Sequence, residues 1–236
     1  MLRITDATNF RRTAAGLCLL AGPLLILLGD LISPATPDGA REYLAFVAEH
    51  QTVGIVSTFL FFSGLVLLVP GVLGSLTPIR GRGVVLAHVA AILATVGLMA
   101  FAALVTTSLY DVELAKSPDR AAAAAVYEGV EDGPAAWALF LPGFLGTALG
   151  LVLFAAAYWR ARLVAPWVPL LVLGGFVTIM AAPNEAVSVA GNAVLVAGLA
   201  AIGLRVLRTT DLEWAAPSAI AAETTSRGAT SREAVA

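Results

Sequence analysis

The chain has 236 residues, of which 59% are apolar and 13% are charged, and its formal net charge is −2. Ordinary globular domains carry roughly 25% charged residues, so this composition excludes a typical soluble domain. The charged residues are also separated by uncharged stretches of about twenty residues, the length that crosses a bilayer core. No basic patch of the density that nucleic-acid binding requires is present. We therefore expect an all-α membrane protein without a nucleic-acid partner.

Six helical spans are predicted, because lipid offers no hydrogen-bond partner to backbone groups outside a helix. They form one transmembrane domain over residues 1–208. The polar segment 209–236 that follows is rich in Ser, Thr and Ala, which is typical of a disordered cytoplasmic tail. The predicted spans are 13–33, 53–76, 84–109, 135–158, 165–182 and 187–207.

Basic residues alternate from one connection to the next. Nine precede the first span, fill the second and fourth connections, or follow the sixth span, whereas the other connections hold three basic residues and ten acids. By the positive-inside rule, both termini are predicted to lie in the cytoplasm. Because arginine outnumbers lysine thirteen to one and alanine is abundant, we expect a bacterial plasma membrane. The nine are Arg3, Arg11, Arg12, Arg80, Arg82, Arg160, Arg162, Arg205 and Arg208.

A competing interpretation of the first span is a cleaved signal peptide. Arg11 and Arg12 precede the apolar run, and Ser33-Pro34-Ala35 resembles a small-residue cleavage site. The run is longer than a usual signal core and Asp30 interrupts the approach to the site, so a retained span is favoured. Charge does not separate the two interpretations, because removal of residues 1–35 leaves the other five spans oriented as before.

Two connections on the predicted outer side are expected to form short helices on the outer surface. Thr36 can cap the first, which runs to about His50 with a proline at its first position. Ser117 is expected to start the second in the same way, and the Asp132-Gly133-Pro134 turn ends it.

These two connections begin with similar stretches, DLISPATPD from Asp30 and DVELAKSPD from Asp111. The offset between the two aspartates is 81 residues, and the offset from Arg80 to Arg160 is 80. A duplicated two-span hairpin would produce this spacing. An alternating membrane protein also places acids outside and arginines inside without duplication, so both explanations stay open.

Ionisable groups near the membrane are the first candidates for function, because their burial in lipid is costly. Asp30 and Asp111 lie near the outer boundary of the first and third spans. Two carboxylates held close together would bind a cation or share a proton. The structural alternative is that both are hydrated in the headgroup layer and simply end their helices.

A polar stripe is predicted on the third span. His88, Thr95 and Thr106 are 7 and 11 residues apart, which returns them to within about 20° of one direction on a helix. As a pathway, the stripe would use His88 as a proton relay. As structure, the threonines would bond to their own helix carbonyls and the histidine would cap a neighbouring loop.

The sixth span adds Asn192 to the polar candidates, and its amide is expected to form a hydrogen bond across a helix interface. Gly146 and Gly150 form a GxxxG motif, which permits close helix packing either within the chain or between copies in a homo-oligomer. Chain-wide, two histidines and one cysteine provide no haem-ligating pair, no disulfide and no cysteine-based metal site. Hydrolase and nucleotide-binding motifs are missing too, so neither a cofactor nor a metal is predicted and an enzyme is disfavoured.

Three stretches are similar to a group of uncharacterised multi-span membrane proteins of high-GC bacteria. They are RRTAAGLCLLAGPLLILLGD, LLVPGVLG before the IRGRG turn, and DVELAKSPDRAA. The resemblance implies the membrane architecture and brings no known activity or site residues. Two functions are therefore carried forward: a binding, structural or regulatory membrane component, and a small permease or channel-like protein using the polar faces of spans three and six.

Overall fold

The computed structural model describes residues 6–33, 37, 39–131, 133–211 and 213–214, and the account below is restricted to them. This part of the chain is helical and contains no strand, which confirms the predicted all-α class. The helices are α1 (Ala7–Ile32), α2 (Ala40–Glu49), α3 (Gln51–Gly74), α4 (Val84–Val105), α5 (Ser108–Leu114), α6 (Arg120–Glu131), α7 (Pro134–Arg160), α8 (Trp167–Met180) and α9 (Glu185–Arg208).

Five of the predicted spans are matched by apolar helices long enough to cross a membrane, and the third of these runs from Val84 to Leu114 through α4 and α5. The predicted fifth span, 165–182, is shorter than expected. Helix α8 has 14 residues, and at 1.5 Å per residue it extends about 21 Å, less than a bilayer core of about 30 Å. Length and composition therefore support five spans, and crossing by α8 stays a prediction.

The long helices pack as three antiparallel hairpins, α1 with α3, α4 with α7, and α8 with α9. In each hairpin a glycine of one helix faces a glycine of the other, so the two backbones approach without side chains between them. The facing pairs are Gly22 with Gly64, Gly97 with Gly146, and Gly175 with Gly191.

The GxxxG motif lies inside the α4–α7 hairpin. A Cβ atom added to Gly146 would lie 2.9 Å from the Cα of Gly97, and one added to Gly150 would lie 2.3 Å from the backbone nitrogen of Ala94. The sequence allows this motif to pack helices within the chain or between copies of the chain. In the structure it packs α7 against α4 within the chain.

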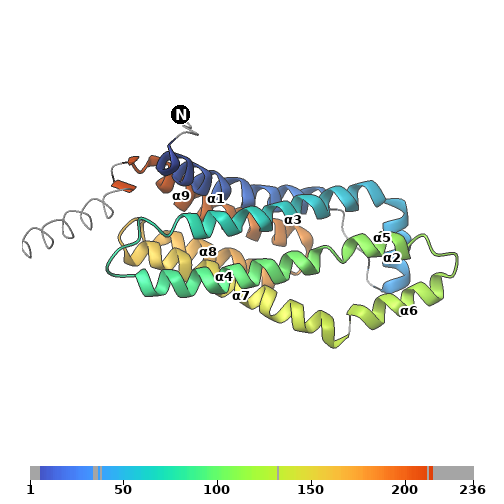
Figure 1. Ribbon diagram of the computed structural model, residues 1–236. Helices are drawn as coiled ribbons and strands as arrows, with labels where there is room; N and C mark the ends of the chain where they lie inside the picture. Colours follow the sequence, from blue (N-terminus) through green and yellow to red (C-terminus); the bar gives the residue numbers. More distant parts are fainter. Residues whose placement is uncertain (1–5, 34–36, 38, 132, 212, 215–236) are drawn as a thin grey trace, which may run out of the picture.

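Helices α2, α5 and α6 gather at one end of the bundle, and we call them the cap unit (Figure 1). Their small core is built mostly from alanine and is closed by the rings of Tyr43 and Tyr127, whose centroids are 4.9 Å apart. The predicted start of α6 differs from the structure. Asp119, rather than Ser117, caps the helix by accepting hydrogen bonds from the N–H groups of Ala121 and Ala122 at 3.1 and 3.0 Å.

The opposite end of the bundle, the terminal end, brings together the start of α1 and the end of α9 (Figure 1). The prediction of a disordered segment from residue 209 is wrong for its first residues. Trp214 is 4% exposed and belongs to the main core cluster together with Val206. The remainder of the predicted tail, residues 215–236, lies outside the described residues, as does the predicted cap Thr36 of α2, which begins at Ala40 after Gly39.

Candidate functional site

The predicted polar residues Asp30 and Asn192 are brought together by the packing of α1 against α9. The backbones of these helices approach closely where Gly16 faces Gly203. Further along the same interface, the side-chain amide of Asn192 donates a hydrogen bond to the carboxylate of Asp30, with Nδ2 and Oδ2 2.8 Å apart. The predicted interhelical hydrogen bond of Asn192 is thus present, and its partner is another of the candidate residues.

Asp111 has a different partner from Asp30. It lies on α5, and its Oδ2 accepts a hydrogen bond of 3.0 Å from the hydroxyl of Tyr43 on α2. Each of the two aspartates is therefore bound to one neutral group on a separate helix. The arrangement links helices in pairs and does not place both carboxylates around one common ligand.

The polar stripe of α4 is directed mainly at its own helix. His88 is exposed, and its Nδ1 lies 2.8 Å from the carbonyl oxygen of Val84. The hydroxyl of Thr106 donates to the carbonyl of Ala103 at 2.6 Å. The hydroxyl of Thr95 is buried without a hydrogen-bond partner among the described residues. Thr106 thus makes the contact that the structural alternative predicts, whereas His88 contacts its own helix instead of a neighbouring loop. None of these contacts joins the stripe to Asn192 or to the aspartates.

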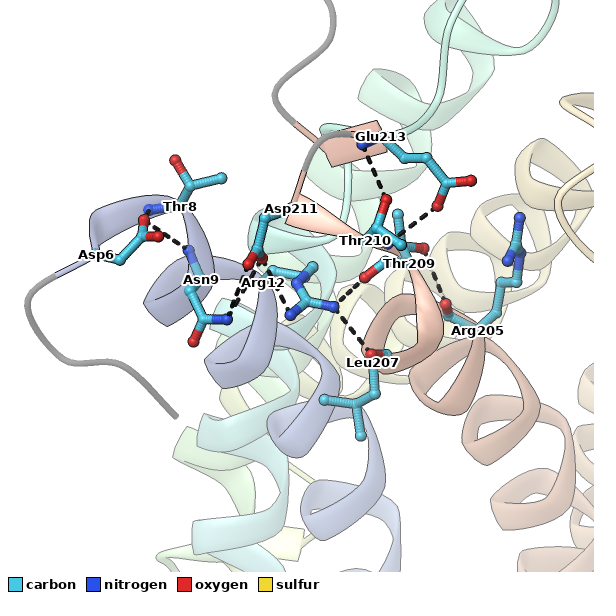
Figure 2. A network of polar contacts seen from close by, with 10 residues as sticks. All are labelled: Asp6, Thr8, Asn9, Arg12, Arg205, Leu207, Thr209, Thr210, Asp211 and Glu213. Carbon is cyan, nitrogen blue, oxygen red and sulfur yellow. Dashed lines mark hydrogen bonds and ion pairs between the residues drawn. The ribbon is translucent and has the colours of Figure 1, made fainter. Parts of the chain in front are cut away.

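A polar site that the sequence analysis missed lies at the terminal end. The Arg12 side chain, 13% exposed, lies between α1 and the end of α9 (Figure 2). Its guanidinium donates to the carbonyls of Leu207, at 3.0 Å, and Thr209, and it forms an ion pair of 3.1 Å with Asp211. The last carbonyls of a helix lack intrahelical partners and carry partial negative charge. Arg12 supplies both the missing donors and the opposite charge.

A second set of contacts orders the residues that follow α9. Thr210 and Glu213 form a capping box: the N–H of Thr210 donates to the Glu213 carboxylate at 3.0 Å, and the N–H of Glu213 donates to the Thr210 hydroxyl at 3.2 Å. The Thr210 hydrogen bond lowers the pKa of Glu213 below its ordinary value. A new helical turn therefore starts immediately after α9.

This turn is also bonded to two other parts of the chain. The side-chain amide of Asn9 donates to Asp211 at 3.3 Å, and the guanidinium of Arg80 donates to the carbonyl of Glu213 at 2.9 Å. We call the contacts of Arg12, Asn9 and Arg80 with residues 207–213 the terminal network. The Thr-x-x-Glu spacing of the capping box is readable in the sequence, whereas the contacts of Arg12 and Arg80, which cross more than a hundred residues, have no local signal.

The cap unit contains the other polar cluster. Burial raises the pKa of Tyr43 above its ordinary value, and the nearby Asp111 raises it further. Burial also raises the pKa of Tyr127, with an additional contribution from Glu131. Both effects favour the neutral phenol, so Tyr43 acts as a hydrogen-bond donor that ties α2 to α5.

Within the described part of the chain, no three His, Cys, Asp or Glu side chains are grouped so that they could hold a metal ion. No family model matches the chain, and comparisons with curated proteins and with solved structures return no match either. The placement of the polar side chains is consequently the basis for any assignment of function.

Proposed function

We propose that this chain is a six-span protein of a bacterial plasma membrane that acts as a binding, structural or regulatory component rather than as a catalyst. The terminal end lies in the cytoplasm and the cap unit lies outside. The alternation of nine basic residues with ten acids along the connections supports this orientation. Packing of α8 along α9 supports α8 as the fifth of the six spans, since it lies alongside a helix that is long enough to cross a membrane.

The observation that carries the proposal is the location of the polar contacts. The terminal network holds residues 207–213 against α1 and against the α3–α4 turn. At the opposite end, the Tyr43–Asp111 hydrogen bond holds two helices of the cap unit together. Between these ends, Asp30 pairs with Asn192, and His88 and Thr106 contact carbonyls of α4. Contacts of this kind position surfaces on the two sides of a membrane, which is what a binding or regulatory component requires.

A small permease is the second candidate, and the Asp30–Asn192 contact is the observation that favours it. This pair places a carboxylate beside an amide between the first and last spans. A polar route would need further groups to continue from this pair, and His88 and Thr106 instead contact carbonyls of α4.

Flux measurements separate the two candidates. Purified protein is reconstituted into liposomes that contain a pH-sensitive dye, and proton and potassium flux are followed under an imposed potential. We expect flux equal to that of protein-free liposomes, with no change in Asp30→Asn or Asn192→Leu. Flux in the unmodified protein that either substitution abolishes would contradict the proposal and support the permease.

Photo-crosslinking in cells tests binding directly. A photoreactive residue replaces Val126 or Val130, exposed positions of the cap unit, and the matched control replaces Ile92, an exposed position of α4. We expect a discrete protein adduct from the cap-unit positions and only lipid adducts from Ile92. Equal adducts from all three positions would remove the cap unit as a binding surface.

Cysteine labelling tests the orientation and whether α8 crosses the membrane. Cysteine is placed at Thr77, Gly129 or Ala181 in a Cys18→Ser background, and intact cells are treated with an impermeant reagent. Thr77 and Gly129 lie outside the expected spans, and Ala181 directly follows the last residue of α8. We expect labelling at Gly129 and Ala181 but not at Thr77. Labelling at Thr77 would reverse the orientation, and protection at Ala181 would exclude crossing by α8.

A further inference from the structure

Two shallow grooves meet at the terminal end of α4 and α7. The larger, about 500 Å³, is lined by the Gly81–Gly83 turn, by Val85, Leu86 and Val89 of α4, and by Arg160 of α7. The smaller, about 310 Å³, shares Leu86 and Arg160 and continues to Trp159 and Arg162. Together they form one surface, which we call the arginine groove.

The close approach of a turn to a helix end creates this groove. Gly83 has a φ of 107°, a conformation that side chains disfavour, and a Cβ atom there would lie 3.0 Å from the carbonyl oxygen of Ala157. The α3–α4 turn therefore lies directly on the last turns of α7. As a result, Arg82 from the turn and Arg160 from the helix line the same groove although 78 residues separate them.

The positive charges of the groove are not neutralised by the protein. Arg82, Arg160 and Arg162 are exposed, and the guanidinium groups of these residues form no hydrogen bond or ion pair with the described part of the chain. No acidic residue lines either groove. Arg12 and Arg80 of the same end differ, since both are bonded to the segment after α9. The groove is thus complementary to an anion.

The floor of the groove is apolar and faces away from the bundle. Val85 is 78% exposed and Trp159 is 50% exposed, and both belong to helices long enough to cross a membrane. Tryptophan prefers the membrane–water interface. The N-terminus of α4 adds partial positive charge there, and no side chain caps it. Cationic and apolar surfaces are therefore continuous at the depth where a lipid headgroup joins its acyl chains.

We propose that the arginine groove binds the phosphate group of an anionic phospholipid. Arg82, Arg160 and Arg162 contact the headgroup, while Val85 and Trp159 pack against the glycerol and the upper acyl chain. A soluble anion would use the arginines alone, whereas a lipid uses both surfaces. The inference requires that α4 and α7 span a bilayer, and it does not depend on the proposed binding or regulatory role.

Native mass spectrometry of the full chain in detergent, with equal amounts of phosphatidylglycerol and phosphatidylcholine, tests the site. The variant is Arg82→Gln/Arg160→Gln, and the matched control is Arg11→Gln/Arg208→Gln, which removes the same charge from exposed arginines of the same end. Each groove arginine is expected to contribute roughly five-fold to the preference for phosphatidylglycerol, or about 25-fold together. The control is expected to change the preference by less than about two-fold.

If the variant and the control lost the preference for phosphatidylglycerol equally, the proposal would be overturned. The preference would then reflect the total positive charge of this end of the protein and not a specific site. Absence of any preference in the unmodified chain would overturn it as well. Each single substitution is expected to lower the preference about five-fold, so the test stands even if the double variant does not fold.

Two further arms distinguish a lipid from a soluble phosphate. Val85→Asn/Val89→Asn keeps every arginine and is expected to weaken binding of phosphatidylglycerol. Inorganic phosphate, added at the lipid concentration, is expected not to displace the lipid. Displacement by inorganic phosphate, or binding that is unchanged in the valine variant, would overturn the assignment to a lipid.

Discussion

The two ends of the bundle differ in which parts of the chain their side chains connect. At the terminal end, hydrogen bonds join segments far apart in sequence: Arg12 reaches Thr209, and the buried hydroxyl of Tyr158 donates to the carbonyl of Ser75 at 2.5 Å. In the cap unit, the core consists of alanines and Leu44, and the Tyr43–Asp111 bond is its long-range polar link.

This difference predicts unequal stability. Hydrophobic stabilisation scales with the apolar area removed from water, and alanine removes little. The cap unit therefore has a weaker core than the bundle, and it is expected to open at a lower free energy while the hairpins stay folded. The terminal end, by contrast, is expected to open only together with the bundle, because its bonds run between α1, α9 and the α3–α4 turn.

The largest loss of stability is expected from Gly97→Val, because the packed interface of α4 and α7 connects the two ends of the bundle. A Cβ atom at Gly97 would lie 2.1 Å from the backbone nitrogen of Thr147. We expect a loss of more than about 3 kcal/mol in the free energy of unfolding, measured in mixed micelles of mild and denaturing detergent. Gly174→Val is the matched control, since no atom lies within 4 Å of a Cβ atom there. Equal effects at the two positions would refute the packing argument.

Arg12→Met is expected to destabilise the terminal end without affecting the cap unit. It leaves the carbonyls of Leu207 and Thr209 and the carboxylate of Asp211 without their common donor. Because Asp211 is partly exposed, we expect a loss of about 2 kcal/mol. Hydrogen exchange should rise in residues 205–214 and stay unchanged in the cap unit. The control is Arg11→Met at an exposed neighbouring position. Increased exchange in the cap unit would show that the ends are not independent.

Alkaline pH is expected to open the cap unit first. The folded state raises the pKa of Tyr43 and Tyr127 above the ordinary value of about 10. Their contribution to stability is therefore complete below pH of about 10 and is lost as the pH rises above it. Loss of helical circular dichroism should accompany tyrosinate absorbance and should not occur in Tyr43→Phe/Tyr127→Phe. Tyrosinate formation without loss of helix in the unmodified chain would contradict the prediction.

Tyr43→Phe at neutral pH is a milder test of the same region. The substitution removes the 3.0 Å hydrogen bond to Asp111 and keeps the ring contact with Tyr127. We expect the cap unit to lose about 1 kcal/mol, detected as faster hydrogen exchange in α2 and α5. Exchange in α4 and α7 should not change. A loss spread evenly over all helices would mean that the cap unit and the bundle unfold together.

The smallest effect is expected from Lys116→Ala. Lys116 and Glu113 form an ion pair of 2.7 Å, but their side chains are 48% and 72% exposed. Such a pair is worth about 0.3 kcal/mol, because water screens both charges. The same micelle measurement should therefore barely detect it. A loss as large as that of Arg12→Met would show that exposure does not distinguish the two ion pairs.

Local features of the structure could be predicted from the sequence. Helix positions follow from the lengths of the apolar stretches, and Asn184 caps α9 through the N–H of Val187, as a residue of this type before an apolar run predicts. For α6 the sequence favours Ser117 as the N-cap, whereas the structure has Asp119 in that role. Ser and Asp are both good N-caps, and the residues around them give no signal that distinguishes the two.

The pairing of the candidate site residues could not be predicted. Asp30 and Asp111 occupy similar positions in similar stretches, yet one bonds to Asn192 and the other to Tyr43. Which side chains meet depends on the rotation and register of whole helices. The rotation and register are set where glycines allow two helix backbones to pack closely, as between Gly16 of α1 and Gly203 of α9.

By itself, therefore, the sequence determined the helical class and the apolar stretches long enough to cross a bilayer, since both depend on residues within a few turns of one another. The tertiary structure alone decided that Arg12 donates hydrogen bonds to the last carbonyls of α9 and that α4 covers the GxxxG face of α7. It also decided that two arginines far apart in sequence line one groove. These outcomes depend on how complete helices fit together, because a contact between distant segments gains its energy only after both have been placed by the rest of the bundle.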